Sequence, residues 1–126
     1  MVQLPLFQPR ATWEAPRLQD LPSWKGALRV AIDIETCDPD LKSTGIGVRR
    51  EGRIVGVSFA IQYPDLKDLT KAPCFYLPFG HEGGGNLDEA QVVQYLKDQA
   101  AEYTGDTVTA GGQYDFDYLA EYGIMF

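Results

Sequence analysis

Two acidic residues lie close together in an otherwise apolar stretch of the sequence. Residues 30–36 read VAIDIET, so Asp33 and Glu35 alternate with Ile32 and Ile34. This period of two predicts a β-strand, in which side chains two positions apart point to the same face. Neighbouring carboxylates repel each other, and removing either from water is costly unless a partner neutralises it. We therefore interpret the pair as candidate ligands for divalent cations, whose charge would explain why an apolar strand tolerates it.

A second acidic pair lies near the end of the sequence, in the stretch QYDFDYL. A helix predicted to begin near Tyr114 would bring Asp115 to the acid pair if the preceding strand lies beside residues 30–36. Three carboxylates suit Mg²⁺ or Mn²⁺, and two such ions about 4 Å apart can drive phosphodiester cleavage. Asp117 is expected to point away into solvent. The alternative is that all these acids are solvated or cap turns.

Length, net charge and cysteine content exclude several classes of protein. The chain has 126 residues, enough for one domain, and a net charge of −7, which argues against a surface that binds nucleic acid through bulk charge. Cys37 and Cys74 form no disulfide framework or zinc spacing. No signal peptide or membrane span is recognisable, so we expect a soluble, cytoplasmic protein with no membrane partner.

The elements that must position the acids follow from periodicity and turn residues. We predict strands at residues 30–36, 53–62, 74–79 and 106–110, and helices at residues 87–103 and from about Tyr114 onward. The first three strands look antiparallel, and the fourth is expected beside the first. The predicted fold class is α/β, a mixed sheet flanked by helices. Asn86, three residues before Glu89, is predicted to cap the first helix.

The proline-rich start differs from the rest of the chain. Residues 1–26 are predicted to be an extended leader that packs Leu6, Trp13 and Trp24 on the body. Residues 27–126 form the predicted domain. Because the sequence ends at EYGIMF without a Gly- or Pro-rich ending, we expect the fold to continue beyond its fourth strand and last helix.

From about residue 28 onward, four segments in order resemble the 3′–5′ exonuclease (proofreading) domain of family-A DNA polymerases. This domain belongs to the DEDD ribonuclease-H-like superfamily. VAIDIET resembles its first motif, GRIVGVSFA and CFYLPFGHEGGGNLD resemble its second and third strands, and TAGGQYDFDYLAEYGI resembles its second motif.

The resemblance implies a ribonuclease-H-like fold in which Asp33, Glu35 and Asp115 hold two Mg²⁺ or Mn²⁺ ions, with Asp33 bridging them. It also implies a single-stranded DNA 3′ end as substrate, a polymerase domain that follows covalently, and a bacterial or phage-infected cell. Thr36 is placed near the terminal nucleotide.

The sequence departs from the family at two places. Gly111 stands where the family has an Asn that organises the substrate, although a glycine also permits close backbone approach. The third motif, with a further Asp and a Tyr or His, is missing, because only eleven residues follow Asp115. We therefore expect the chain alone to be inactive as an enzyme. The alternatives are a non-catalytic remnant that guides DNA and, less favoured, an exonuclease acting on RNA.

Three further features allow two interpretations each. Tyr114, Tyr118 and Tyr122 either stack on bases or pack in the core. The basic cluster of Arg49, Arg50 and Arg53 either contacts phosphates or is solvated. The lone histidine, His81, is expected to anchor a loop rather than act as a general base.

Overall fold

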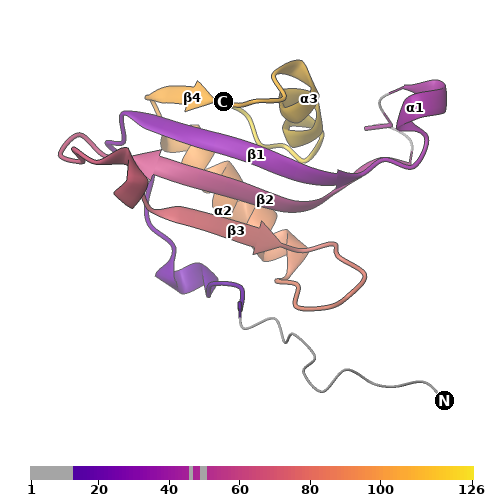
Figure 1. Ribbon diagram of the computed structural model, residues 1–126, viewed down its shortest axis with the longest axis horizontal. Helices are drawn as coiled ribbons and strands as arrows, with labels where there is room; N and C mark the ends of the chain where they lie inside the picture. Colours follow the sequence, from indigo (N-terminus) through magenta and orange to yellow (C-terminus); the bar gives the residue numbers. More distant parts are fainter. Residues whose placement is uncertain (1–12, 46, 49–50) are drawn as a thin grey trace, which may run out of the picture.

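The computed structural model describes residues 13–45, 47–48 and 51–126. Its four strands form one sheet with the order β3-β2-β1-β4 (Figure 1). The strands are β1 (Arg29–Cys37), β2 (Arg53–Gln62), β3 (Cys74–Pro78) and β4 (Asp106–Val108). The helices are α1 (Leu41–Thr44), α2 (Glu89–Glu102) and α3 (Gln113–Glu121), and short 3₁₀ turns η1 (Leu18–Asp20) and η2 (Leu69–Lys71) precede β1 and β3.

The pairing of the strands confirms the predicted topology. β2 is antiparallel to both β1 and β3, whereas β4 runs parallel to β1 at the other edge. β4 is shorter than predicted and ends at Val108, because the chain then turns through Gly111 and Gly112 into α3. The predicted α/β class with a mixed sheet is confirmed.

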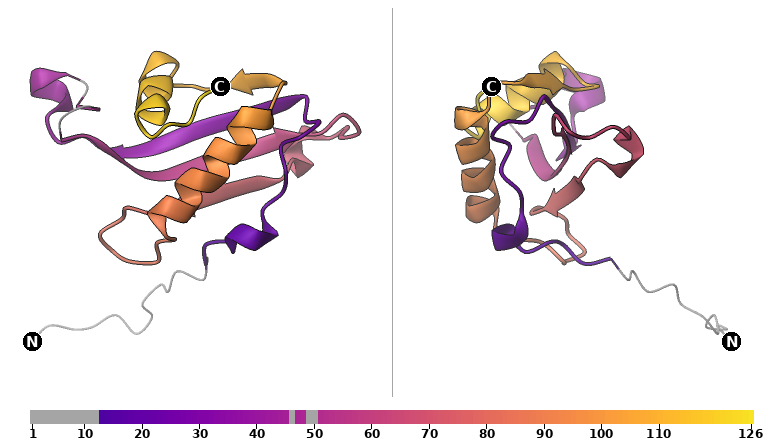
Figure 2. Two further views of the ribbon diagram at one scale, coloured as in Figure 1. Left: turned by 180° about the vertical axis from the view of Figure 1, so that it is seen from behind. Right: turned by 90° about the vertical axis from the view of Figure 1, so that its left-hand side faces the viewer.

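Both longer helices lie on one face of the sheet. Figure 1 shows α2 crossing behind the strands, and the left view of Figure 2, seen from behind, shows it in front of them with α3 beside β1 and β4. α2 buries Val92, Leu96 and Ala100, spaced four residues apart as one helical face requires. The opposite face of the sheet carries no helix in the described part of the chain.

The start of α2 corrects one prediction. Its N-cap is Asp88, whose carboxylate accepts a hydrogen bond from the Gln91 amide at 2.9 Å. Asn86 was wrongly assigned this role. Its side chain instead pairs with the backbone N–H and C=O of His81, at 2.9 and 2.7 Å. Asp88 and Gln91 have the same three-residue spacing as Asn86 and Glu89, and the loop hydrogen bonds decide between the two starts.

The segment before β1 is tied to the core through Trp24. This side chain has no exposed surface and contacts the rings of Phe59, Tyr95 and Tyr103. The predicted packing of Trp24 is therefore confirmed, whereas Leu6 lies outside the described residues. Within the described ranges, no helix has both the length and the apolar character needed to cross a membrane.

Candidate functional site

Asp33 and Glu35 lie on the open face of the sheet. β1 alternates strictly along this stretch: Ile32 and Ile34 are buried toward the helices, and both acids are exposed. The shared face predicted for the pair is confirmed. Because both carboxylates are exposed, the strand tolerates them without burying a charge, and cation binding by the pair stays a prediction.

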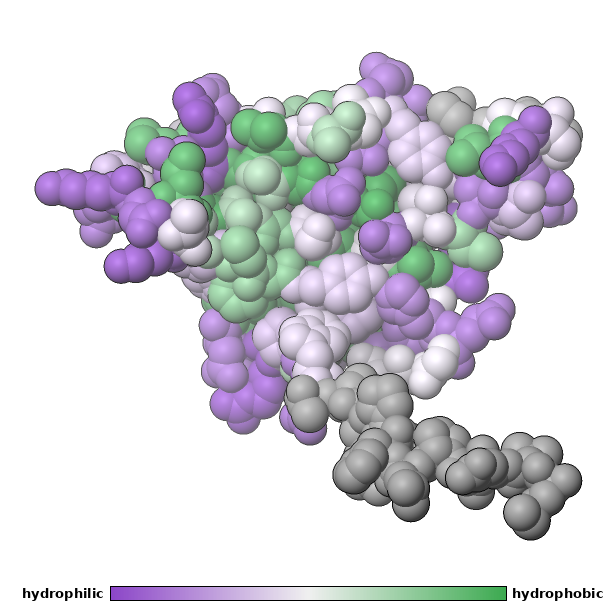
Figure 3. Space-filling view, in the orientation of Figure 1, coloured by the Kyte–Doolittle hydropathy of each residue, from purple (hydrophilic) through white to green (hydrophobic). Residues whose placement is uncertain are grey.

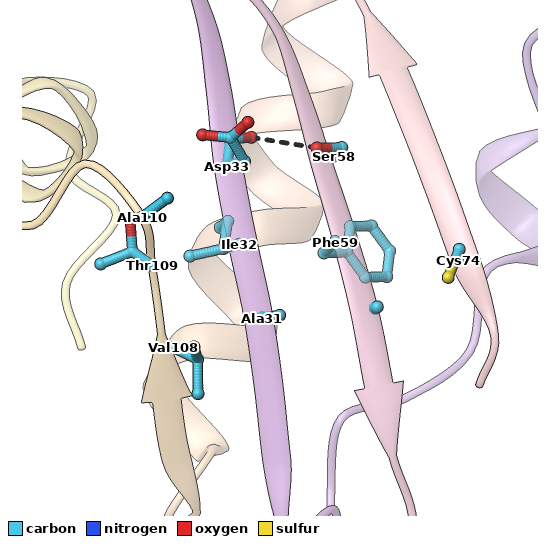
Figure 4. Close-up of a pocket in the computed structure, with 10 residues that line it drawn as sticks. Ala31, Ile32, Asp33, Ser58, Phe59, Cys74, Val108, Thr109 and Ala110 are labelled. Atoms are coloured by element: carbon cyan, nitrogen blue, oxygen red, sulfur yellow. Dashed lines mark hydrogen bonds between the residues drawn. The ribbon is translucent and has the colours of Figure 1, made fainter. Parts of the chain in front are cut away.

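A shallow hollow of about 460 Å³ lies beside Asp33 (Figure 4). Residues of β1 and β2 line it together with Val108, Thr109 and Ala110, which come from β4 and the turn after it. Ser58 on β2 donates a hydrogen bond to the Asp33 carbonyl oxygen at 3.4 Å. The hollow therefore joins the first acidic residue to the segment that leads into α3.

Asp115 sits in the first turn of α3 and is only 2% exposed. The hydroxyl of Thr109 donates a hydrogen bond to its Oδ2 atom. The carboxylate also benefits from the positive end of the helix dipole at this position. Since Thr109 lines the hollow beside Asp33, one residue links the two predicted motifs.

Gly111 is required by the position of the Asp115 carboxylate. A Cβ atom at residue 111 would overlap Oδ1 of Asp115. The group that approaches Gly111 closely is the carboxylate of the candidate ligand Asp115, and a role of Gly111 in substrate binding stays a prediction. A bulkier residue at 111 would push this carboxylate out of its present place.

Thr36 and Tyr114, both predicted to bind substrate, contact each other. Their hydroxyl oxygens are 2.7 Å apart, and both residues are half-buried. Since Thr36 points to the helix-covered side of β1, this hydrogen bond fixes the first turn of α3 against that strand. Their contact with a nucleotide stays a prediction.

The three tyrosines of α3 attach the helix to the ends of two strands. Besides Tyr114, Tyr118 donates to Oδ2 of Asp38 at 2.6 Å, and Tyr122 accepts from the Ile54 amide at 3.0 Å. Tyr118 has no exposed surface, so the packing interpretation is confirmed for it. Burial raises the pKa of Tyr118, and its hydrogen bond to Asp38 raises that pKa further.

The three candidate ligands fit a hard cation in type, because all are carboxylates. Asp33 and Glu35 are accessible, whereas Asp115 is enclosed and bonded to Thr109. Among the described residues, no three His, Cys, Asp or Glu side chains are grouped closely enough to hold a metal ion. The structure thus presents two candidate ligands on one face of β1 and the third candidate apart from them.

Other predicted features have structural roles. Asp117 accepts a hydrogen bond from Gln113 at 2.6 Å, one helical turn away on the surface of α3. His81 anchors the loop after β3 through Asn86 and through a hydrogen bond between its Nε2 atom and the Tyr76 hydroxyl. Arg53 bonds the Gly80 carbonyl oxygen at 2.8 Å, while Arg49 and Arg50 lie outside the described residues.

Sequence reasoning missed Thr109 and Tyr76. Thr109 carries no local signal, since its role depends on the turn that returns Asp115 to it. Tyr76 alternates correctly for the open face of β3, at the register position of Ser58 and hence of Asp33. This pairing register could have pointed to Tyr76, but the strand order needed to apply it was known only from the structure.

Comparison with known proteins agrees with a polymerase relationship. The chain is 49% identical over 128 aligned positions, covering 99% of its length, to a DNA-directed DNA polymerase of Pseudomonas phage M6. No protein-family model matches the chain. The chain spans about 18% of the length of that polymerase. Over nearly its whole length, the chain is therefore similar to one part of a phage DNA-directed DNA polymerase.

Proposed function

We propose that the chain is part of a metal-dependent 3′–5′ DNA exonuclease domain of a family-A DNA polymerase. The observation that carries this proposal is the exposed pair Asp33 and Glu35 on β1. The helix α3 is docked on the same strand, and its Asp115 is hydrogen-bonded to Thr109. The similarity to a phage polymerase supports a DNA substrate. The expected substrate is a single-stranded DNA 3′ end.

In this proposal Asp33, Glu35 and Asp115 hold Mg²⁺ or Mn²⁺. When bound, such ions supply the positive charge that phosphodiester hydrolysis requires. Thr109 acts as a positioning residue, because its hydroxyl fixes the orientation of the Asp115 carboxylate. Thr36 and Tyr114 hold the first turn of α3 in place through the hydrogen bond between their hydroxyls.

Mn²⁺ binding by the purified chain tests the ligand assignment. Titration calorimetry should show that Asp33→Ala loses Mn²⁺ affinity, because it removes a ligand from the accessible pair. Asp117→Asn is the matched control, since it changes an acid on the surface of α3 and should bind Mn²⁺ like the unmodified chain. Unchanged Mn²⁺ affinity in Asp33→Ala would refute the assignment.

Digestion of 5′-labelled single-stranded DNA in Mn²⁺ tests the activity. Shortening from the 3′ end that disappears in Asp33→Ala supports the exonuclease. Two Thr109 variants test the positioning role through Mn²⁺ binding: Thr109→Val should lower Mn²⁺ affinity about 10- to 100-fold, whereas Thr109→Ser keeps the hydroxyl and should retain most of that affinity. Equal Mn²⁺ affinity in the two variants would remove Thr109 from the proposal.

The second candidate is a non-catalytic module that guides DNA. It is favoured by one observation, the enclosure of Asp115 in the turn, away from the accessible acid pair. This module would bind single-stranded DNA equally well in EDTA and in Mn²⁺, and it would digest none. Retained DNA affinity in Asp33→Ala, together with Mn²⁺ affinity that this substitution leaves unchanged, would select it over the exonuclease.

A further inference from the structure

Three aromatic rings gather on β3 and the segments beside it. The rings of Trp13 and Tyr76 lie 5.9 Å apart between centroids, at an angle of 42°. The ring of His81 meets Tyr76 edge-on at 5.9 Å, and its Nε2 atom is hydrogen-bonded to the Tyr76 hydroxyl. Trp13 is 55% exposed. We refer to Trp13, Tyr76 and His81 as the β3 platform.

The β3 platform lies next to the acid pair on the open face. In the sheet register, Asp33 is opposite Ser58, which is opposite Tyr76. The hydroxyl of Tyr76 rests over Gly56, the residue opposite Glu35, where a Cβ atom would overlap it. Burial raises the pKa of Tyr76, and the charge of Glu35 raises that pKa further. The Tyr76 side chain therefore leans across β2 toward Glu35.

The positively charged side chain of Arg53, the first residue of β2, lies beside the loop that carries His81. Arg53 is exposed, and its hydrogen bond to the Gly80 carbonyl oxygen holds the guanidinium at the start of the loop that carries His81. Figure 3 shows that this side of the molecule has its hydrophobic residues gathered toward β4, with hydrophilic ones around them. The β3 platform thus lies near the acid pair of β1, and Arg53 lies beside the loop that carries its His81.

We propose that the β3 platform binds the bases of single-stranded DNA by stacking. Aromatic rings stack on any base, and each stacked base contributes enough to dominate binding where phosphate contacts are few. The net charge of −7 makes phosphate contacts a poor source of affinity, so base stacking must supply it. Bases paired in a duplex are not available for this contact. The identity of the occupant rests on the proposed function, since DNA is inferred from the polymerase relationship.

Tryptophan fluorescence gives a direct test on the full chain. The chain has two tryptophans, and Trp24 has no exposed surface, so quenching by bases reports on Trp13. Titration with oligothymidylate of about 12 nucleotides in EDTA should quench this signal. A duplex of the same length and an abasic oligonucleotide should leave it unchanged. Quenching by the abasic strand to the same extent would overturn the stacking proposal.

Variants measured by fluorescence anisotropy give the matched comparison. Trp13→Ala and Tyr76→Leu should each weaken binding of the single strand roughly 5- to 100-fold. Tyr76→Phe keeps the ring but loses the hydrogen bond to His81, and it should bind more tightly than Tyr76→Leu. Phe126→Ala is the second control, because it removes another exposed ring, one that stacks on Trp24 at 6.0 Å. Circular dichroism verifies that each variant is folded.

The outcomes separate this inference from the proposed function. Affinity that is unchanged in Trp13→Ala and Tyr76→Leu, or a folded chain that binds no single strand, overturns the β3 platform. If binding depends on these rings but Asp33→Ala leaves the Mn²⁺ affinity unchanged, the platform stands and the exonuclease proposal fails. If digestion occurs with the same KM in Trp13→Ala, the platform fails alone.

Discussion

The two faces of β1 use the same alternation for opposite purposes. Ile32 and Ile34 point into the layer closed by α2 and α3, whereas Asp33 and Glu35 point into solvent. The covered face supplies hydrophobic stabilisation, and the open face holds the groups that can do chemistry. An acid pair in an apolar strand is therefore no sign of buried charge, because a strand in a one-sided sheet has a solvated face.

The two tryptophans repeat this contrast and predict the largest effect. Trp24→Ala should lower the free energy of unfolding by about 3–5 kcal/mol, because it empties the centre of the aromatic cluster. Trp13→Ala should lower it by about 1 kcal/mol or less, since that ring is more than half exposed. Urea unfolding of both variants measures the difference. Equal losses would show that the open side contributes to stability as much as the core.

Neighbouring residues of β1 offer a second comparison. Ile32→Ala should cost about 2–5 kcal/mol, since Ile32 is 2% exposed. Asp33→Ala should change the free energy of unfolding by only about 0.5 kcal/mol in either direction. For Mn²⁺ affinity the order of the two effects should be reversed, with Asp33→Ala causing the greater loss. A large loss of stability in Asp33→Ala would mean that its carboxylate has a structural role.

The tyrosines of α3 should differ in what their hydroxyls contribute. Tyr118→Phe removes a donor to the Asp38 carboxylate and should cost about 1.5–3 kcal/mol, as expected for a hydrogen bond to a charged group. Tyr114→Phe removes a neutral, half-buried hydrogen bond to Thr36 and should cost about 0.5–1.5 kcal/mol. Denaturant midpoints of the two variants test this order, and a larger loss in Tyr114→Phe would contradict it.

The free energy of unfolding should fall gradually at alkaline pH, because tyrosines on the covered face are buried. Burial raises the pKa of Tyr95, Tyr118 and Tyr122 above the ordinary value of 10.0. Above that pH the unfolded chain loses phenolic protons that the folded chain keeps, so the free energy of unfolding falls as pH rises. Denaturant midpoints from pH 8 upward should stay constant and then decline beyond about pH 10. Tyr118→Phe should decline less steeply, and an identical slope would exclude Tyr118 as a contributor.

Local pattern predicted the four strands and the two longer helices, but it missed α1 and made β4 two residues too long. Alternation predicted β1 and β2 and put Asp33 with Glu35 on one face, and four-residue spacing predicted the buried side of α2. These features depend on residues a few positions apart, whose geometry the backbone fixes. The cap of α2 shows the limit of such reasoning, since two overlapping patterns were available and only the loop bonds of Asn86 selected Asp88.

The sequence by itself determined which residue types are present, how they alternate, and the resemblance of its motifs to an exonuclease. Only the tertiary structure decided that the acid pair lies on a solvated face, that Thr109 holds Asp115, and that Tyr76 reaches toward Glu35. The hydroxyl partners of Tyr114 and Tyr118 are 78 and 80 residues away in the chain. Such contacts follow from strand order and from the docking of α3, because groups so distant in sequence meet only when the whole sheet has formed.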